Sequence, residues 1–281
     1  MDPIEHSAIH SRENARFKLI RSLSGSRGVK KHGLSVLAGR RLIAECLAER
    51  PESAELLVIA QSAGAQDPAQ PEQPDPPGLS QLPEEISARL STAPGLRRAA
   101  FTPELFRELD FLGAGSPLLI VRTPELPVWN SEDPASLSGL TVFLPLSDPE
   151  NLGAAIRSCA AFGVDRIVLL KEAAHPFHPR ALRSAAGQTW RTPLFLGPSL
   201  AQLDPMDQQI ASPVLYALDL VGEDLSDAPP GGHVALLVGE EGPGIPDTLR
   251  CRRLRIPMRG EVESLNAGVA LGIALYHFRR I

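Results

Sequence analysis

Between residues 140 and 281, short apolar segments alternate with segments of helical pattern. The apolar segments predict strands at 141–146, 166–170, 213–220, 234–239 and 253–258. A short helix is predicted in AAIRSCAAF (154–162), ended by Gly163, and a closing helix from about Ser264 to Arg279. Continuous apolar strands separated by helices are typical of a mostly parallel sheet covered on both faces. The predicted class is therefore α/β, with ligands expected at the carboxyl ends of the strands.

The preceding residues predict a smaller α/β unit. Its elements are a helix near 39–50, a strand at 55–60, helices within 83–90 and 102–112, and a strand at 117–122. The segment 61–83 is rich in proline and predicts a flexible or disordered insert. The Pro- and Ser-rich stretch 123–139 reads as a connector. We therefore expect domains at 1–122 and 140–281, joined by 123–139.

Length and composition set broad limits. The 281 residues, 43% of them hydrophobic, suffice for one large domain or two ordinary ones. No run of about 18 apolar residues could span a bilayer, and MDPIEHSAIHSREN has no apolar signal-peptide core. A soluble, cytoplasmic protein without a membrane partner is expected. Cys46, Cys159 and Cys251 are far apart and predict small buried hydrophobes, with neither a disulfide framework nor a metal site.

Positive charge is concentrated in two places despite a net charge of -5. Residues 1–50 contain ten Lys or Arg against five Asp or Glu, a local balance of +5. The second group comprises five arginines: Arg250, Arg252, Arg253, Arg255 and Arg259. Each group could be only a solvated face, but two of them leave phosphate binding open.

Two loops that follow predicted strands have unusual composition. In SDPENLGAAIR (147–157), Asp148 and Asn151 are turn or N-cap formers, and Arg157 is expected about one turn into the next helix. For this loop taken alone, a capped helix with a surface arginine is the favoured explanation. In VGEEGPGIP (238–246), three glycines would expose backbone groups to a flat or polar ligand, unless they only make a tight turn. Neither loop carries a glycine fingerprint for dinucleotides, which disfavours a nucleotide-dependent oxidoreductase.

The third loop lies in IPMRGEVESLNAGVALGIAL (256–275). Ser264 and Asn266 are both good N-cap residues for the closing helix. One helix needs one cap. The second side chain is therefore a candidate for holding a ligand or substrate.

Together these loops resemble the three motifs of the SpoU/TrmH class of RNA ribose 2'-O-methyltransferases. The matching patterns are N-x-G-x-x-x-R in NLGAAIR, G-x-E-G-x-G in GEEGPG, and IPM followed by ESLN. The segment HPRALRSAAGQTWRTP (178–193) also resembles the linking region of that family. The resemblance covers roughly 140–281. Residues 1–122 look like the small RNA-binding domain, related to kink-turn-binding ribosomal proteins, that often precedes this catalytic domain.

The resemblance implies a parallel sheet threaded into a deep trefoil knot, a homodimer, and S-adenosyl-L-methionine as cofactor. It assigns cofactor contacts to the backbone around Leu237, Gly239, Ile256, Met258 and Leu265. Close approach of crossing chain segments would explain a set of small residues: Gly239, Gly242, Gly244, Ala267, Gly268 and Gly272.

The catalytic residues that the resemblance implies are Arg157, Asn151, Glu241, Ser264 and Asn266. Arg157 matches the essential arginine of the family, either as the base or as a group that clamps phosphate and orients the 2'-OH. A planar, permanently charged fork suits the clamping role better. The other four would position Arg157, the ribose and the loop, with Glu241 as the ion-pair partner of Arg157.

We therefore expect methyl transfer from S-adenosyl-L-methionine to a ribose 2'-OH of structured RNA, ribosomal RNA in preference to transfer RNA. The alternatives are a transfer-RNA 2'-O-methyltransferase and a non-catalytic RNA-binding or ribosome-assembly factor with the same fold. Glu240 and the pair Ala267-Gly268 depart from the usual family pattern, which has Asn at the first position and Val-Ser or Val-Ala at the second. These departures bear on substrate preference and, to a smaller degree, on activity.

Overall fold

The computed structural model describes residues 8–61, 82–90, 93, 95–115, 117–130, 138–203, 214–239, 244–260 and 264–279. The described residues form two compact units. The first contains those up to Pro124 together with Phe177–Arg183, and the second contains Glu125–Pro176 and the residues from Ser184 onward. The short segment Phe177–Arg183 thus groups with the first unit, although the sequence placed it in the C-terminal domain. The expected insert lies almost wholly outside the described residues.

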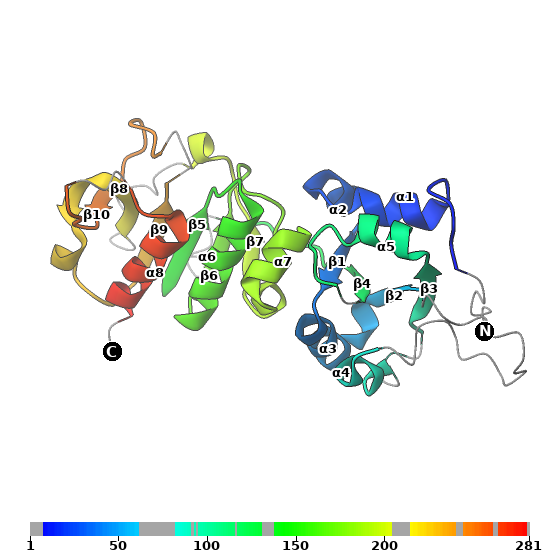
Figure 1. The fold of residues 1–281 in the computed structure, drawn as a ribbon. Coiled ribbons are helices and arrows are strands. Elements are labelled where there is room, and N and C mark those ends of the chain that lie inside the picture. Colours follow the sequence, from blue (N-terminus) through cyan, green and yellow to red (C-terminus); the bar gives the residue numbers. More distant parts are fainter. Residues whose placement is uncertain are drawn as a thin grey trace, which may run out of the picture. The chain divides into compact units, whose positions relative to one another are not determined.

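The first unit is a four-stranded mixed sheet with helices around it (Figure 1). Its elements along the chain are α1 (Ala15–Ser22), α2 (Ser26–His32), β1 (Leu34–Ala38), α3 (Arg40–Glu49), β2 (Ala54–Ala60), α4 (Glu84–Ser87), β3 (Arg97–Phe101), α5 (Pro103–Leu109) and β4 (Leu118–Arg122). The strand order is β1-β4-β2-β3; β4 is antiparallel to β1 and β2, and β2 is parallel to β3. The predicted elements are present, but α1, α2, β1 and β3 were not predicted.

The second half of the chain contains a six-stranded sheet in the order β10-β8-β9-β5-β6-β7. Its elements are β5 (Leu140–Leu144), α6 (Pro149–Ala161), β6 (Arg166–Leu169), α7 (Pro179–Ala185), β7 (Leu194–Leu196), β8 (Val214–Asp224), β9 (Val234–Val238), β10 (Arg252–Arg255) and α8 (Ala267–Phe278). Every strand pair in it is parallel. The prediction of a parallel α/β sheet is confirmed.

Both faces of this sheet are covered, because successive side chains of each strand point to opposite faces. Val142 of β5 and Leu236 of β9 pack in one core with α6 and α8, which lie side by side (Figure 1). Phe143 and Leu237, the next residue of each strand, pack in the other core. This alternation explains why the strands read as continuous apolar runs.

The first strand-end loop is shorter than predicted. The helix α6 begins at Pro149, so residues that the sequence assigned to a loop form its first turn. The side chain of Asp148 accepts from the backbone N–H of Asn151 at 2.8 Å, and Pro149 occupies the first helical position, which needs no N–H donor. Arg157 therefore lies more than two turns into the helix, not one.

The connector is partly attached to the sheet. Val128 forms a parallel bridge with Leu196 of β7, and the backbone N–H of Trp129 donates to the Leu196 carbonyl at 2.8 Å. The Trp129 ring packs edge-on against Phe143 at 5.2 Å between centroids. This anchor fixes one part of 123–139, while 131–137 lie outside the described residues.

The pairing of β8 with β10 contains a large register shift. Arg253 lies opposite Ala217, whereas the next residue, Leu254, lies opposite Glu223. Residues 218–222 of β8 therefore loop out of this ladder. Gly222 permits the loop, since its φ is +127° and a Cβ there would lie 2.2 Å from the Arg253 carbonyl oxygen.

Candidate active site

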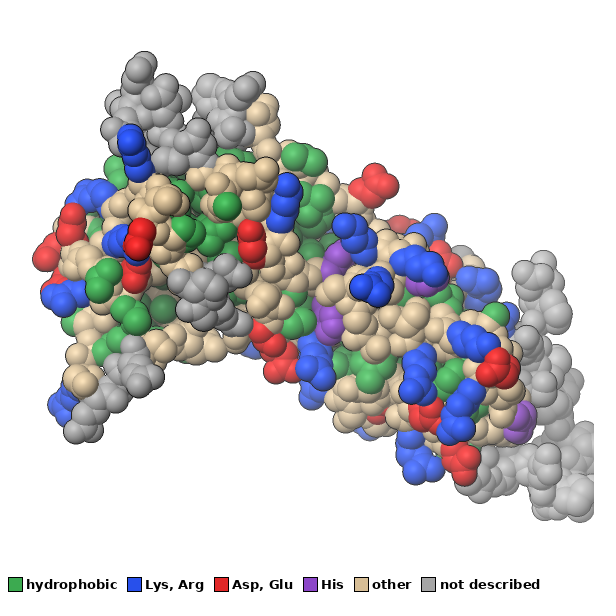
Figure 2. Space-filling view, turned by 90° about the horizontal axis from the view of Figure 1, so that it is seen from above, with side chains coloured by type: hydrophobic (Ala, Val, Ile, Leu, Met, Phe, Trp, Pro, Cys, Tyr) green, Lys and Arg blue, Asp and Glu red, His purple; other side chains and the backbone are tan. Residues whose placement is uncertain are grey.

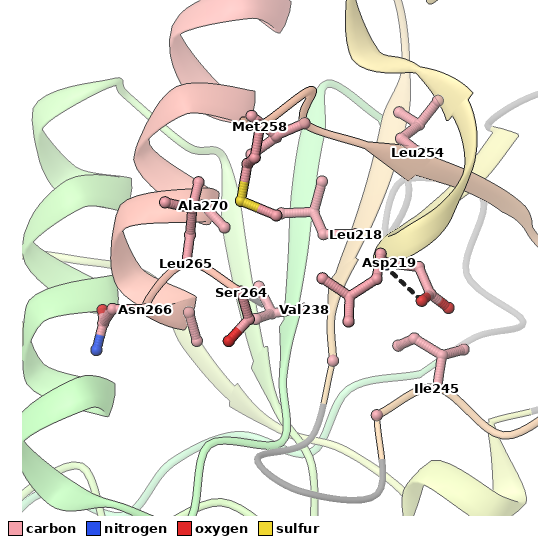
Figure 3. A pocket seen from close by; sticks show the side chains of 15 residues that line it. Leu218, Asp219, Val238, Ile245, Leu254, Met258, Ser264, Leu265, Asn266 and Ala270 are labelled. Carbon is pink, nitrogen blue, oxygen red and sulfur yellow. Dashed lines mark hydrogen bonds between the residues drawn. The ribbon is translucent and has the colours of Figure 1, made fainter. Parts of the chain in front are cut away.

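A cavity of about 490 Å³ opens at the carboxyl ends of β9 and β10, beside residues 218–220 in the middle of β8 (Figure 3). Its lining is mainly apolar, with a few polar groups: Leu218, Asp219, Leu220, Val238, Gly239, Gly244, Ile245, Leu254, Ile256, Met258, Ser264, Leu265, Asn266, Ala267 and Ala270. A concave, mostly apolar site of this size with few polar groups is typical of a small-molecule site. It lies where a parallel sheet places its ligands, as the sequence predicted.

The two candidate cap residues of α8 have separate roles. The Asn266 side-chain oxygen accepts from the backbone N–H groups of Gly268 at 2.9 Å and Val269 at 3.4 Å, so Asn266 is the N-cap. Ser264 is exposed and lines the cavity. No hydrogen bond to its hydroxyl comes from any residue that the structure describes. The spare polar group inferred from the sequence is therefore Ser264.

Asn266 also links α8 to α6. Its amide nitrogen donates to the side-chain oxygen of Asn151 at 2.9 Å. In Figure 3 the Asn266 side chain points toward α6 and away from the centre of the cavity. The first and third motifs thus meet at one amide-to-amide hydrogen bond, beside a wall of the cavity.

Gly268 is explained by this arrangement. A Cβ at Gly268 would lie 3.2 Å from the Asn266 side-chain oxygen and 3.6 Å from the Ala154 Cβ of α6. The first of these distances is tight, so a larger residue would press on the cap. Glycine at position 268, where the family usually has Ser or Ala, therefore suits the close packing of α8 on α6.

Only some of the other predicted site residues line the cavity. Gly239, Ile256, Met258 and Leu265 line the cavity, whereas the Leu237 side chain is buried in the core on the opposite face of the sheet. Arg157 is exposed on α6 and is not part of the lining. Glu241, its expected partner, lies outside the described residues, as does Glu240.

Close chain crossing does not explain most of the small residues. A Cβ at Gly244 or at Gly272 would meet nothing within 4 Å, and a Cβ at Gly239 would make only ordinary contact, 3.5 Å from the Leu218 carbonyl oxygen. Gly244 instead has a positive φ of +73°, which glycine adopts without strain. Gly242 lies outside the described residues.

Sequence reasoning missed the contribution of β8. Leu218, Asp219 and Leu220 line the cavity because the register shift lifts 218–222 out of the ladder with β10. The dipeptide Val221-Gly222 in mid-strand was the available signal, because glycine inside a strand pattern indicates a bulge.

The three cysteines are free thiols. Cys46 and Cys159 are buried, as predicted, and burial raises the pKa of both thiols. Cys251 is only half-buried.

Within the described ranges, no three His, Cys, Asp or Glu side chains come together as a metal site. In the same ranges, no helix has both the length and the apolar character needed to cross a bilayer.

The sequence model of the SpoU rRNA Methylase family matches residues 140–276. The second half of the chain belongs to this family. We refer to residues 140–276 as the SpoU domain. The resemblance inferred from the three motifs is confirmed, and the cavity is formed by residues of this domain.

Two relatives illustrate the match. "Ribosomal RNA small subunit methyltransferase G 2" of Syntrophobacter fumaroxidans is 38% identical over 273 residues, 97% of this chain and 49% of that protein. "23S rRNA (guanosine-2'-O-)-methyltransferase RlmB" of Xylella fastidiosa is 37% identical over 150 residues, 49% of this chain and 56% of that protein. The chain thus spans about half the length of the curated relatives it matches, and the second match is about as long as the SpoU domain.

The fold has a solved counterpart over nearly the whole chain. The SpoU methyltransferase AviRb from Streptomyces viridochromogenes, crystallised with AdoMet, is 24% identical, with a TM-score of 0.67. The similarity covers 95% of this chain and 98% of that one. The similarity therefore extends beyond the SpoU domain to the fold of the first unit.

Proposed function

We propose that this protein transfers a methyl group from S-adenosyl-L-methionine to a ribose 2'-OH of RNA. One observation carries the proposal. Residues of the second and third motifs line a cavity, and at its wall Asn266 of the third motif donates a hydrogen bond to Asn151 of α6, the helix that carries Arg157. A parallel-sheet domain of the SpoU family with such a cavity fits this reaction better than a purely structural RNA-binding role.

The cavity fits the cofactor in size and chemistry. Its volume of about 490 Å³ lies within the range of about 300–1,000 Å³ usual for small-molecule sites. Ile256, Met258 and Leu265 supply apolar surface for a base, and Met258 points into the cavity (Figure 3). Gly239 and Gly244 leave backbone groups accessible. When bound, S-adenosyl-L-methionine supplies an electrophilic methyl group on a sulfonium sulfur.

The polar residues then have distinct roles. Arg157, exposed and permanently charged, clamps phosphate and orients the ribose hydroxyl. The Ser264 hydroxyl, at the cavity wall, is available to bind the ribose. Asn151 and Asn266 hold α6 against the start of α8, which fixes the position of Arg157 relative to the cavity. Glu241 is assigned the pairing role with Arg157 that the resemblance implies.

The substrate class we favour is ribosomal RNA. The name of the Xylella relative specifies 2'-O-methylation of guanosine in 23S rRNA. The Syntrophobacter relative also has a ribosomal name, but the matched part is 49% of that protein, so its activity could reside elsewhere. Transfer RNA remains the alternative substrate.

The first unit is assigned to RNA binding. Arg27, Lys30 and Lys31 are exposed on α2, and none of them forms an ion pair within the described part of the chain. In the view of Figure 2, Lys and Arg side chains gather over the α1–α2 face of this unit. Unpaired cations on one face are suited to binding phosphates.

A homodimer is also part of the proposal. Val269, Ile273 and Tyr276 of α8 are 51%, 40% and 63% exposed, and their spacing puts them on one face of the helix. A second copy would bury this apolar stripe. Sedimentation equilibrium should give the mass of two chains. The trefoil knot and the cytoplasmic location remain predictions.

Replacing Arg157 tests the reaction. Arg157→Ala should lower the transfer of radiolabelled methyl from S-adenosyl-L-methionine to ribosomal RNA by about 10²–10³-fold, because removal of one electrostatic clamp in a reacting site has effects of this order. Cofactor affinity, measured by calorimetry, should stay within about twofold, since Arg157 does not line the cavity.

The matched control is Arg250→Ala, which removes another exposed arginine with no assigned role. It should leave methyl transfer unchanged. Loss of cofactor binding in Arg157→Ala would refute the role assigned to Arg157. Absence of S-adenosyl-L-methionine binding by the unmodified protein would refute the proposed function itself.

A further inference from the structure

Three ion pairs join β8 to β10 at one edge of the sheet. Glu223 pairs with Arg252, Asp219 with Arg253, and Asp224 with Arg255. Among these six side chains, those of Asp219 and Arg253 are the most buried, at 17% and 22% exposure. The other two pairs lie on more accessible surface.

The Asp219–Arg253 pair also holds a third segment. The second guanidinium nitrogen of Arg253 donates to the carbonyl oxygens of Pro246 at 3.1 Å and Ile245 at 3.4 Å. It lies 3.3 Å from a carboxylate oxygen of Asp247 as well. Arg253 thus bonds both to β8 and to the chain that leaves the second-motif loop.

Both of these segments form walls of the cavity. Asp219 and Leu220 of β8 line it, as do Gly244 and Ile245. In Figure 3, Asp219 and Ile245 lie on the same side of the cavity, facing α8. The other carboxylate oxygen of Asp219 accepts from the backbone N–H of Leu220 at 2.6 Å. The same carboxylate therefore shapes the looped-out 218–222 and anchors the arginine.

We propose that Asp219 and Arg253 form a positioning latch that sets the width of the cofactor cavity. The inference rests on the proposed function, because it takes the cavity to be the S-adenosyl-L-methionine site. Residues 218–222 lie outside the β8–β10 ladder, so backbone pairing with β10 does not hold them in place. The latch replaces that constraint with side-chain bonds at a half-buried site, where charge-assisted hydrogen bonds are stronger than on open surface.

The two residues act through the cavity walls and not on the reacting atoms. Loosening the latch should therefore raise the concentration of cofactor that is needed, without changing the rate once the cavity is filled. A merely structural pair would change stability alone.

The test compares two nearly isosteric substitutions on the same strand. Asp219→Asn removes the charge that holds Arg253, whereas Asp224→Asn removes the neighbouring charge that holds Arg255, outside the cavity. Calorimetry with S-adenosyl-L-methionine should give an about tenfold weaker Kd for Asp219→Asn, and methyl transfer to ribosomal RNA should show a matching rise in KM with kcat kept. Asp224→Asn should bind like the unmodified protein.

Arg253→Lys covers the case in which Asp219→Asn does not fold. Lysine keeps a positive charge near Asp219 but lacks the fork that reaches the Ile245 and Pro246 carbonyls, so it should also weaken cofactor binding. The latch is refuted if a folded variant binds within twofold of the unmodified protein, or if Asp224→Asn weakens binding as much. Failure of the unmodified protein to bind S-adenosyl-L-methionine would instead overturn the proposed function.

Discussion

The two arginine- and lysine-rich parts of the chain look alike in sequence but differ in the structure. At the C-terminal group, Arg252, Arg253 and Arg255 each pair with a carboxylate of β8. A hydrogen bond with Glu223 raises the pKa of Arg252 accordingly. On α2, Arg27 and Lys30 have no carboxylate partner among the described residues. Three of the five C-terminal arginines are thus used in internal ion pairs, whereas the cations of α2 are available to an external anion.

Even within the first unit the contrast holds. Arg12 precedes α1 and Arg21 lies on it, and both form ion pairs with Glu108. The hydrogen bond from Arg12 lowers the pKa of the Glu108 carboxyl. Lys18 pairs with Glu13. A local charge count cannot detect such pairing, since Glu108 and Glu223 lie far along the chain from most of the cations that they neutralise. The sequence therefore overestimates the positive charge that is left unpaired in both groups.

The largest expected effect, on the free energy of unfolding, comes from disturbing the close approach of β8 to β10, the strand that carries the paired C-terminal arginines. Gly222→Ala would place a Cβ 2.2 Å from the Arg253 carbonyl oxygen at a φ of +127°. The free energy of unfolding should fall by about 3 kcal/mol, since backbone strain of this kind costs on the order of 1–3 kcal/mol before the clash is counted. Denaturant unfolding followed by tryptophan fluorescence measures it, because Trp129 and Trp190 both belong to the second unit.

Gly260→Ala is the control for Gly222→Ala. A Cβ at Gly260 would meet nothing within 4 Å, so this variant should lose far less stability. Equal losses in the two variants would mean that the close approach of Gly222 to β10 has no energetic consequence.

An intermediate effect is expected from α2. Lys30→Gln combined with Lys31→Gln should weaken binding to ribosomal RNA on the order of 10- to 100-fold at about 0.1 M salt, since each lost phosphate contact contributes about tenfold there. The slope of log affinity against log salt should fall by about 1–2. Fluorescence anisotropy over a salt series measures both quantities. An unchanged slope would show that α2 does not contact phosphate.

The smallest effect should follow from the matched change at the C-terminal group. Arg252→Gln combined with Arg255→Gln removes the same amount of charge from partners that already neutralise it. RNA affinity should stay within about twofold, and stability should fall by about 0.2–1 kcal/mol for each exposed pair. A loss of RNA affinity equal to that of the α2 variant would abolish the distinction between the two groups.

The fold of the second unit was largely predictable, because its strands are apolar on both faces and separated by helical segments. The first unit was harder. Its α2 is only seven residues long, and neither β1, which contains Ser35, nor β3, which begins with two arginines, reads as a continuous apolar run. The start of α6 was missed because Asp148-Pro149 reads as a turn but forms a cap and a first helical residue.

The candidate site was predicted in part. The residues Gly239, Ile256, Met258 and Leu265 do share one cavity, because each follows a strand that ends at the same edge of the sheet. Asp219 was not predicted, since its position depends on a register shift between β8 and β10, of which Gly222 was the available sign in the sequence. The assignment of Ser264 and Asn266 also needed coordinates, because either residue can cap a helix.

Asn266 gives the start of α8 a property that a simple cap would not. The first turn of a helix ordinarily frays independently of the rest of the molecule. Here the side chain that satisfies the first N–H groups is itself held by Asn151 on a neighbouring helix. Opening this turn therefore disrupts a contact of α6, the helix that carries Arg157. Local opening at the start of α8 is therefore coupled to the position of Arg157 on α6.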